Sequence, residues 1–184
     1  ISFCWHGGEP TTAGLAYFKK AVELQKKYSD GKQIDNTLQT NGILIDQEWC
    51  RFFIENNFLV GLSIDGPASV HDGNRIWNGH RSSFDAAVRA AEMFHDTGVE
   101  FNTLTTVNKL NEDRGEEVYI FLRDVIGSTF MQFLPVADQA ENPSKASIHS
   151  TTPEGYGKFL TDIFDIWVRN DVGNVFVQIF ESTL

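Results

Sequence analysis

Cysteine is scarce in this 184-residue sequence, which contains only Cys4 and Cys50. A disulfide-stapled secreted domain needs several cysteines in a short chain, so that class of protein is excluded. Two cysteines far apart in the sequence do not form a metal site by themselves, and we assign no metal ligand to this chain. We expect Cys4, which lies in an apolar run, to be buried as a small apolar residue.

Basic residues are also in short supply, with 15 Lys and Arg against 25 Asp and Glu and a formal net charge of −10. Nucleic-acid surfaces need a basic stripe, and anionic membranes attract basic segments, so neither partner is expected. No apolar run approaches the roughly 20 residues that span a bilayer. We therefore expect a cytoplasmic protein.

Short apolar runs alternate along the chain with segments of helical period, a pattern typical of parallel strands joined by helical crossovers. It predicts an α/β fold, a partial (β/α) barrel with outer helices that forms one domain over residues 1–184. Polar loops are expected from residue 65 to about 81 and over 137–152. The predicted strands cover 1–5, 34–39, 58–64, 99–107 and 130–136, and the predicted helices cover about 12–28, from 46, 82–98, 112–125 and 153–169.

The size of the chain and its first residues bear on its completeness. A full eight-stranded barrel takes roughly 250 residues. The sequence begins in an apolar run without an initiator Met. We expect an internal fragment of a larger barrel that lacks the first strand.

Polar residues gather where the predicted strands end, which is the edge that carries the chemistry of (β/α) barrels. The first strand is followed by a segment from His6 to Pro10, the second by Gln39 and Asn41, and the third by Ser63 with Arg75 in the loop beyond. This placement favours a small-molecule site.

These residue types suit an amino-acid-like ligand, although each also has a purely structural interpretation. Gly7 and Gly8 let a ligand approach the backbone, or simply allow a tight turn. Glu9 could accept hydrogen bonds from an ammonium group, or be a solvated surface carboxylate. Arg75 could bind a carboxylate with its fork of donors, or be a surface cation. His6 could be a base, a hydrogen-bond donor or a packed histidine.

Four segments, in order and at these distances, resemble the anaerobic sulfatase-maturing branch of the radical S-adenosylmethionine enzymes. They are Trp-His-Gly-Gly-Glu-Pro-Thr at 5–11, Leu-Gln-Thr-Asn-Gly at 38–42, Gly-Leu-Ser-Ile-Asp-Gly-Pro at 61–67 and His-Asp-Gly-Asn-Arg at 71–75. The resemblance extends along nearly the whole chain.

The resemblance implies a [4Fe–4S] cluster that cleaves S-adenosylmethionine to a 5′-deoxyadenosyl radical, with a Cys or Ser of a sulfatase polypeptide oxidised to formylglycine. It also implies an electron donor such as flavodoxin or ferredoxin. In this family the cofactor supplies the chemistry, and the protein positions and shields it. The cysteine loop that holds the cluster is expected outside this chain, and so is the C-terminal domain with the Asp that accepts a proton. We therefore assign no catalytic residue and expect this chain alone to be inactive.

By position, the resemblance divides the candidate residues into two groups. The first would bind S-adenosylmethionine, with the Gly-Gly-Glu-Pro segment on its ammonium group. The second would face the peptide substrate. The cofactor group comprises Gly7, Gly8, Glu9, Pro10, Asn41, Ser63 and Arg75, and the substrate group comprises His6 and Gln39.

Three other interpretations stay open at this stage. The chain could belong to a radical enzyme that modifies another peptide. It could be a non-catalytic regulator that binds a sulfatase. It could also be an ordinary barrel enzyme that uses Glu9 and His6 as acid and base, although no Gly-rich phosphate site is evident near the later strands.

We predict that this chain alone does not bind a stoichiometric [4Fe–4S] cluster, because a cluster of this type needs three close thiolates and the sequence has two distant ones. Anaerobic reconstitution with iron and sulfide, followed by gel filtration, absorbance and EPR, measures this. A cluster that stays with the chain through gel filtration would contradict the prediction.

Overall fold

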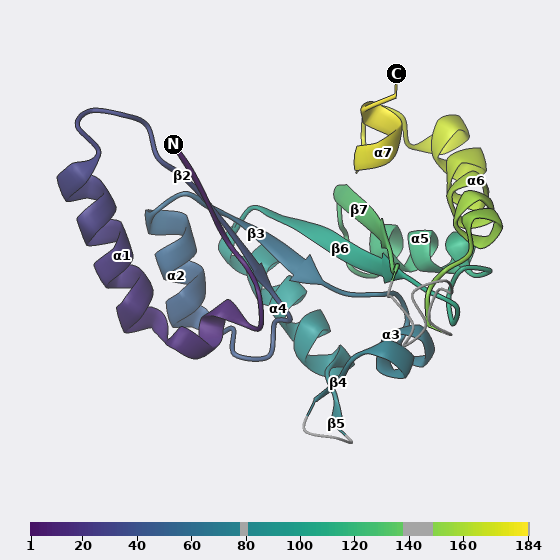
Figure 1. The fold of residues 1–184 in the computed structure, drawn as a ribbon, viewed down its shortest axis with the longest axis horizontal. Coiled ribbons are helices and arrows are strands. Elements are labelled where there is room, and N and C mark those ends of the chain that lie inside the picture. The colour runs from purple at the N-terminus through teal and green to yellow at the C-terminus, as the bar shows by residue number, and fades with distance from the viewer. Residues whose placement is uncertain (78–80, 138–148, 184) are drawn as a thin grey trace. The chain divides into compact units, whose positions relative to one another are not determined.

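The computed structural model describes residues 1–77, 81–137 and 149–183, and within them six strands form one open sheet (Figure 1). Their order is β1-β2-β3-β6-β7-β8, and the helices surround the sheet. The predicted order of five strands is therefore confirmed, with a short sixth strand added. The strands are β1 (Ser2–Trp5), β2 (Asp35–Thr40), β3 (Phe58–Ser63), β6 (Phe101–Val107), β7 (Phe130–Pro135) and β8 (Phe176–Val177).

The helices alternate with the strands, as the sequence periodicity predicts. The helix expected over 12–28 is split, because Gly14 adopts a φ of +80° between a 3₁₀ turn and α1. Asp46 caps α2 by accepting hydrogen bonds from two backbone N–H groups of the first turn. The helices are the 3₁₀ turn (Pro10–Ala13), α1 (Leu15–Tyr28), α2 (Gln47–Glu55), α3 (Ala68–Asn74), α4 (Phe84–Thr97), α5 (Gly115–Asp124), α6 (Pro153–Asn170) and α7 (Gln178–Glu181).

The chain divides into two compact units, and the first comprises residues 1–63 and 85–102. Its strands β1, β2 and β3 are paired in parallel. Its core is aromatic: the ring of Phe18 lies 5.4 Å from that of Trp49, and Phe53 lies 5.5 Å from Trp49 and 6.4 Å from Phe94. These rings come from α1, α2 and α4, so the three helices pack together in this unit.

Cys4 is exposed, and the expectation that it is buried is wrong. Its neighbour Trp5 packs against Phe18 of α1, at 5.3 Å between ring centroids. Successive side chains of a strand point to opposite faces, so Cys4 points away from α1. The buried cysteine is Cys50, on α2; burial raises the pKa of its thiol.

The second unit comprises residues 64–84 and 103–184. Here β7 pairs in parallel with β6 and β8, and α5 packs against α6. The indole N–H of Trp167 on α6 donates to the Val175 carbonyl at 2.7 Å, which holds the turn before β8. The Tyr119 hydroxyl on α5 donates to Asp171 after α6, also at 2.7 Å, so the two helices are tied at this end.

The sequence led us to expect a simple polar loop after β3, and this expectation is wrong. It contains α3 and a two-stranded antiparallel hairpin, β4 (Ile76–Trp77) and β5 (Arg81–Ser82). The Pro67 carbonyl accepts hydrogen bonds from the N–H groups of Val70 and His71, and Val70 is buried, which anchors the short helix. Of the long loop expected over 137–152, residues 138–148 lie outside the described residues. The assignment of residues 1–184 to a single domain stays a prediction.

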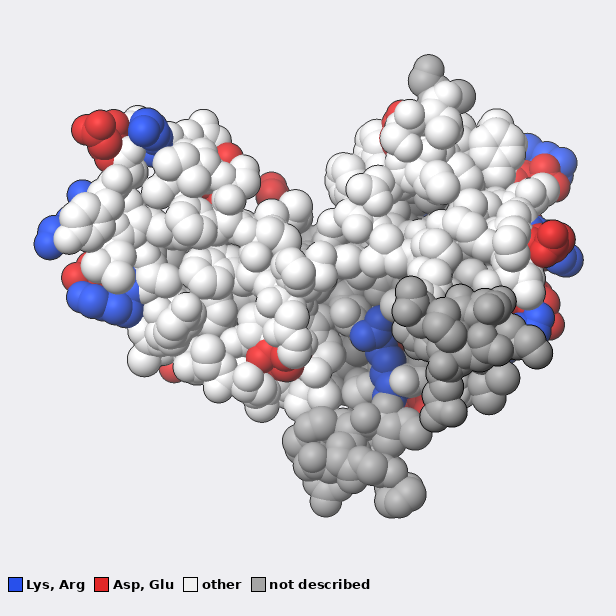
Figure 2. All heavy atoms as spheres, in the orientation of Figure 1, with Lys and Arg blue, Asp and Glu red and all other residues white. Residues whose placement is uncertain are grey.

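Charged side chains gather on the outer helices. Figure 2 shows acidic and basic residues interspersed over α1 and again over α6. On these helices Lys20 pairs with Glu23 and Lys158 pairs with Asp162. Exposed pairs of this kind contribute little to stability. In the described part of the chain, no helix is long and apolar enough to cross a membrane.

A buried carboxylate links the start of α5 to the start of α6. Glu112 accepts hydrogen bonds from the Thr151 hydroxyl (2.7 Å) and the Thr152 N–H (2.9 Å), and it pairs with Lys109. These donors lower the pKa of Glu112 to about 2, the contact with Lys109 contributing most. A Cβ added at Gly155 would lie 2.2 Å from the carboxylate, so the first turn of α6 closes over it.

We predict that Glu112 makes the stability of this chain pH-dependent at acid pH. Because its folded pKa lies below the unfolded value, its contribution is complete above about pH 4.5 and is lost as the pH falls towards 2. Glu112→Gln should cost about 1–3 kcal/mol at pH 7 and flatten this part of the profile. Urea unfolding between pH 2 and 7 measures both, and the exposed Glu116→Gln is the control. Equal profiles for wild type and Glu112→Gln would contradict the prediction.

Candidate functional site

In the first unit, the Glu9 carboxylate is held by donors from two strand ends. Oε1 accepts hydrogen bonds from the Thr11 hydroxyl (2.6 Å), the Thr11 N–H (3.1 Å) and the Thr40 hydroxyl (2.8 Å). Oε2 accepts one, from the Asn41 N–H at 2.8 Å. All four donors are neutral, so none of them cancels the negative charge of the carboxylate. Oε2 can accept a further hydrogen bond from a cation.

The backbone before Glu9 is open. Gly7 and Gly8 have φ values of +88° and +56°, which side-chain-bearing residues rarely adopt, and no heavy atom lies within 4 Å of a Cβ built at either. The positive φ values therefore explain why glycine occupies both positions, and steric crowding of a Cβ does not. Their peptide groups are exposed beside the Glu9 carboxylate, as a ligand-binding turn requires.

The other candidates of this unit have free side chains. His6 is exposed, Gln39 and Ser63 are half-buried, and none of the three side chains forms a hydrogen bond within the described residues. Asn41 differs, because its Oδ1 accepts a hydrogen bond from the Ile43 N–H at 3.0 Å. The Asn41 side chain thus shapes the turn, and its backbone N–H orients Glu9.

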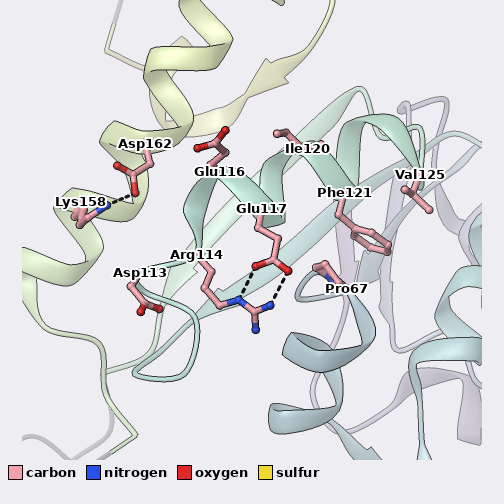
Figure 3. A pocket seen from close by; sticks show the side chains of 10 residues that line it. All are labelled: Pro67, Asp113, Arg114, Glu116, Glu117, Ile120, Phe121, Val125, Lys158 and Asp162. Atoms are coloured by element: carbon pink, nitrogen blue, oxygen red, sulfur yellow. Dashed lines mark hydrogen bonds and ion pairs between the residues drawn. The ribbon is translucent and has the colours of Figure 1, made fainter.

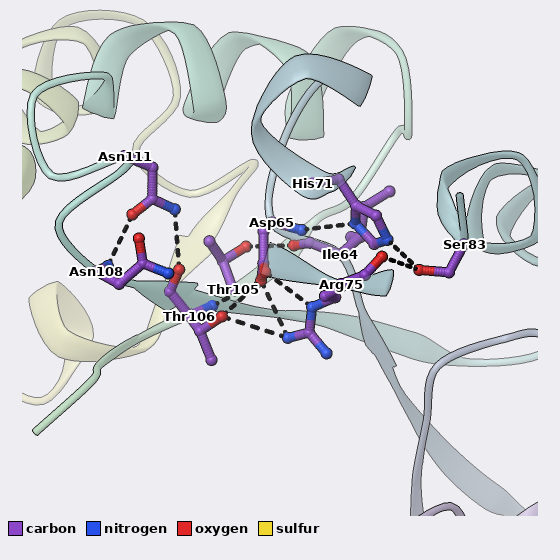
Figure 4. Close-up of polar contacts among 9 residues, drawn as sticks. All are labelled: Ile64, Asp65, His71, Arg75, Ser83, Thr105, Thr106, Asn108 and Asn111. Carbon is purple, nitrogen blue, oxygen red and sulfur yellow. Dashed lines mark hydrogen bonds and ion pairs between the residues drawn. The ribbon is translucent and has the colours of Figure 1, made fainter. Parts of the chain in front are cut away.

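In the second unit, Arg75 is paired with a fully buried carboxylate (Figure 4). Arg75 Nε lies 2.8 Å from Asp65 Oδ2, and Nη2 lies 3.0 Å from Oδ1. Thr106 donates to the same Oδ1 from its N–H at 2.9 Å and its hydroxyl at 3.0 Å. Asp65 is therefore the anchor of Arg75.

The pairing leaves part of the Arg75 guanidinium available. A guanidinium has five N–H donors, and Asp65 takes two on the Nε side. Nη1 has no hydrogen-bond partner within the described residues, Nη2 makes a further, long contact of 3.5 Å with the Thr106 hydroxyl, and the Arg75 side chain is 24% exposed. The end of the guanidinium between Nη1 and Nη2 can therefore bind a second carboxylate through two parallel hydrogen bonds.

His71 lies beside this pair, and its hydrogen bonds define its tautomer. Nδ1 accepts from the Asp65 N–H at 3.3 Å, and Nε2 lies 2.9 Å from the Ser83 hydroxyl. The Ser83 hydroxyl donates to the Arg75 carbonyl at 3.0 Å, so it must accept from His71 Nε2–H. Burial lowers the pKa of His71 below its usual value, which favours this neutral form.

A groove in the second unit is a poor alternative site. It is lined by apolar residues of α5, such as Ile120 and Phe121, and by charged residues, of which both cations are already paired (Figure 3). Arg114 pairs with Glu117 at 2.6 Å, and Lys158 pairs with an aspartate one turn further along α6. The groove offers no unpaired cation among its lining residues for an anionic ligand.

The structure also identifies supporting residues that the sequence interpretation missed. Thr11 and Thr40 orient Glu9, and Thr106 and His71 support Asp65. Thr11, Thr40 and His71 lie within the quoted motifs, and this position was the sequence signal that could have identified them. Thr106 lies outside the motifs, and no sequence signal marked it. Among the described residues, no group of three or more His, Cys, Asp or Glu side chains could hold a metal ion.

We predict that Gly42, which follows Thr40 and Asn41, cannot be replaced by alanine without loss of stability. Its φ is +79°, and an added Cβ would lie 3.0 Å from Ala90 Cβ and 3.1 Å from Leu62 Cδ1. Gly42→Ala should cost about 2–4 kcal/mol from both effects.

Gly31→Ala is the matched control, because Gly31 has a φ of +75° but open space around it. It should cost only about 1 kcal/mol, since a less flexible unfolded chain offsets part of the strain. Urea unfolding of both variants measures the difference, and equal losses would show that the contacts of Gly42 are unimportant.

Comparisons with known proteins agree with the motifs. The model of the Radical SAM superfamily matches residues 2–122. The chain is 42% identical over 198 aligned residues to the serine-type anaerobic sulfatase-maturating enzyme of Bacteroides thetaiotaomicron, covering all of this chain and 48% of that protein. It is 40% identical over 186 residues to the cysteine-type enzyme of Clostridium perfringens, covering all of this chain and 50% of that protein. The chain thus spans about half the length of these curated relatives.

Solved structures agree on the fold. Native anSMEcpe with bound AdoMet and Cp18Cys peptide matches with a TM-score of 0.91 and 39% identity, over 98% of this chain and 50% of that one. Streptococcus suis SuiB matches with a TM-score of 0.71 at 17% identity, over 96% of this chain and 38% of that one, which concerns the fold alone. The chain therefore belongs to the Radical SAM superfamily, and the predicted resemblance to anaerobic sulfatase-maturating enzymes is confirmed.

Proposed function

We propose that this chain is the S-adenosylmethionine-binding part of an iron–sulfur radical enzyme that oxidises a Cys or Ser of a sulfatase polypeptide to formylglycine. The observation that carries the proposal is the identity of about 40% over the whole chain to both serine- and cysteine-type anaerobic sulfatase-maturating enzymes. When bound, the cluster and S-adenosylmethionine would supply the radical chemistry that oxidises the target side chain. The proposal includes a cytoplasmic location and an electron donor such as flavodoxin or ferredoxin.

The residues of the first unit suit the ammonium end of the cofactor. Glu9 is an anion whose Oε2 retains hydrogen-bonding capacity, and the turn at Gly7 and Gly8 leaves backbone groups accessible. A charge-assisted hydrogen bond from an ammonium group to Oε2 would be stronger than a neutral one. In this proposal Pro10 fixes the direction of the chain after Glu9, and Asn41 holds Glu9 through its backbone N–H.

The residues of the second unit suit a carboxylate. Arg75 presents the end of its guanidinium, and its other edge is occupied by Asp65. Ser63, at the end of β3 in the first unit, offers a free hydroxyl for the carboxylate or ribose of the cofactor. His6 and Gln39, whose side chains form no hydrogen bonds within the described residues, are proposed to face the peptide substrate.

The cluster requires ligands beyond those described. The exposed Cys4 and the buried Cys50 do not form a three-thiolate site, and no other metal-binding group occurs among the described residues. The proposal therefore assigns the cluster to a cysteine loop in a longer form of the protein.

We predict that Glu9→Ala and Arg75→Ala each weaken the binding of S-adenosylmethionine by the complete, cluster-loaded enzyme. Each change removes a charged hydrogen-bonding partner, so each should cost about 1–3 kcal/mol. Equilibrium dialysis measures the affinity, and Lys20→Ala, on the exposed side of α1, is the control. Unchanged affinity in both variants would refute the binding assignment.

The reaction itself is tested with the complete enzyme under reducing conditions and a sulfatase peptide that carries a Cys or a Ser. Cleavage of S-adenosylmethionine and a peptide mass that corresponds to formylglycine are expected. Cleavage without modification of either peptide would preserve the superfamily assignment but indicate a radical enzyme for another peptide. Absence of cleavage by the reconstituted enzyme would refute the radical mechanism.

A further inference from the structure

We propose that Asp65, His71 and Ser83 are positioning residues that orient the Arg75 guanidinium through a closed ring of hydrogen bonds. The inference deepens the proposed function and rests on it, because Arg75 is the residue proposed to bind the cofactor carboxylate. None of the three touches the ligand in this proposal; they act through Arg75.

The ring can be followed from one donor to the next (Figure 4). The Asp65 N–H donates to His71 Nδ1 at 3.3 Å, and His71 Nε2–H donates to the Ser83 hydroxyl at 2.9 Å. The Ser83 hydroxyl donates to the Arg75 carbonyl at 3.0 Å. The Arg75 guanidinium donates to the Asp65 carboxylate through Nε and Nη2, which closes the ring. Both the backbone and the side chain of Arg75 are thus fixed.

Each link occupies a group that would otherwise be costly to bury. Asp65 is 0% exposed, His71 1% and Ser83 5%, so none of these side chains can exchange its partner for bulk water. Leaving a buried donor or acceptor without a partner destabilises the folded state. The ring therefore has one favourable arrangement, with the proton of His71 on Nε2.

The balance of burial and nearby charges favours a neutral imidazole at His71. Asp65 and Asp72 favour the protonated imidazole, whereas burial and Arg75 oppose it. A proton on Nδ1 would also face the Asp65 N–H, a donor opposite a donor. Protonation of His71 would therefore open the ring at the bond to Asp65.

The consequence concerns the exposed end of Arg75. Asp65 neutralises the charge of the guanidinium, so a second carboxylate gains less from net charge than it would beside an isolated arginine. Binding of a second carboxylate then depends mainly on hydrogen bonds from Nη1 and Nη2, and the plane of the guanidinium sets the directions of these bonds. A ring that fixes this plane lowers the ordering cost of ligand binding.

The test uses the complete, cluster-loaded enzyme and the affinity for S-adenosylmethionine measured by equilibrium dialysis. Ser83→Ala removes the donor to the Arg75 carbonyl and should raise the Kd about 3- to 10-fold. Ser82→Ala is the matched control: Ser82 is an exposed neighbour whose hydroxyl binds Asp72 and caps α4 through the Phe84 N–H, outside the ring. It should leave the Kd unchanged.

A double variant separates positioning from a general loss of structure. In the Arg75→Ala background, Ser83→Ala should raise the Kd no further, because its effect passes through Arg75. An equal rise in both backgrounds would overturn the proposal. If Ser83→Ala does not fold, His71→Asn provides the same test, since its amide oxygen can replace Nδ1 but its side chain is too short to reach Ser83.

The remaining outcomes distinguish this inference from the proposed function. If Arg75→Ala weakens binding but Ser83→Ala and His71→Asn do not, the ring is overturned and the cofactor assignment survives. If Arg75→Ala leaves the Kd unchanged, both are overturned. Independently of the cofactor, ¹⁵N NMR of labelled histidine, with the signal identified by its loss in His71→Gln, should show the Nε2–H tautomer. A proton on Nδ1 at neutral pH would also overturn the ring.

Discussion

The local structure around Arg75 depends on one constraint, the complete burial of the Asp65 carboxylate. A buried charge must be paired and hydrogen-bonded to offset its lost hydration. Asp65 meets this need with the guanidinium of Arg75 and two donors of Thr106 on β6. Because these residues are far apart in the sequence, the carboxylate draws the segment that contains α3 back onto β6. Opening this segment would leave Asp65 without donors.

The Glu9 carboxylate is half-buried and is held by a different kind of donor than Asp65, which matters for ligand binding. Its four donors are neutral, so its negative charge is oriented but not cancelled. Asp65 and Arg75 cancel each other, and only directed N–H groups are left to a ligand. One unit thus presents an oriented anion and the other an oriented pair of donors.

The parts of the fold that the sequence predicted are those determined by local interactions. β3 is a nearly continuous apolar run, Asp46 caps its helix within three residues, and Gly98 ends α4 with a φ of +81°. The segment from Asp65 to Arg81 was interpreted as a loop because it is polar and contains Gly and Pro. It contains the short helix α3, which would not persist alone, and the hydrogen bond of Asp65 with the distant Thr106 and the burial of Val70 stabilise it.

By itself the sequence determined the family, the strand order and the candidate residues at the strand ends, since motifs and periodicity are properties of neighbouring residues. Only the tertiary structure decided that Cys4 is exposed, that Glu9 is held by Thr11 and Thr40, and that Arg75 is held by Asp65. The burial of a side chain and its hydrogen-bond partners are decided when segments distant in the sequence pack together. A side chain's chemistry is encoded locally, but the groups that it contacts are selected by the packing of the whole unit.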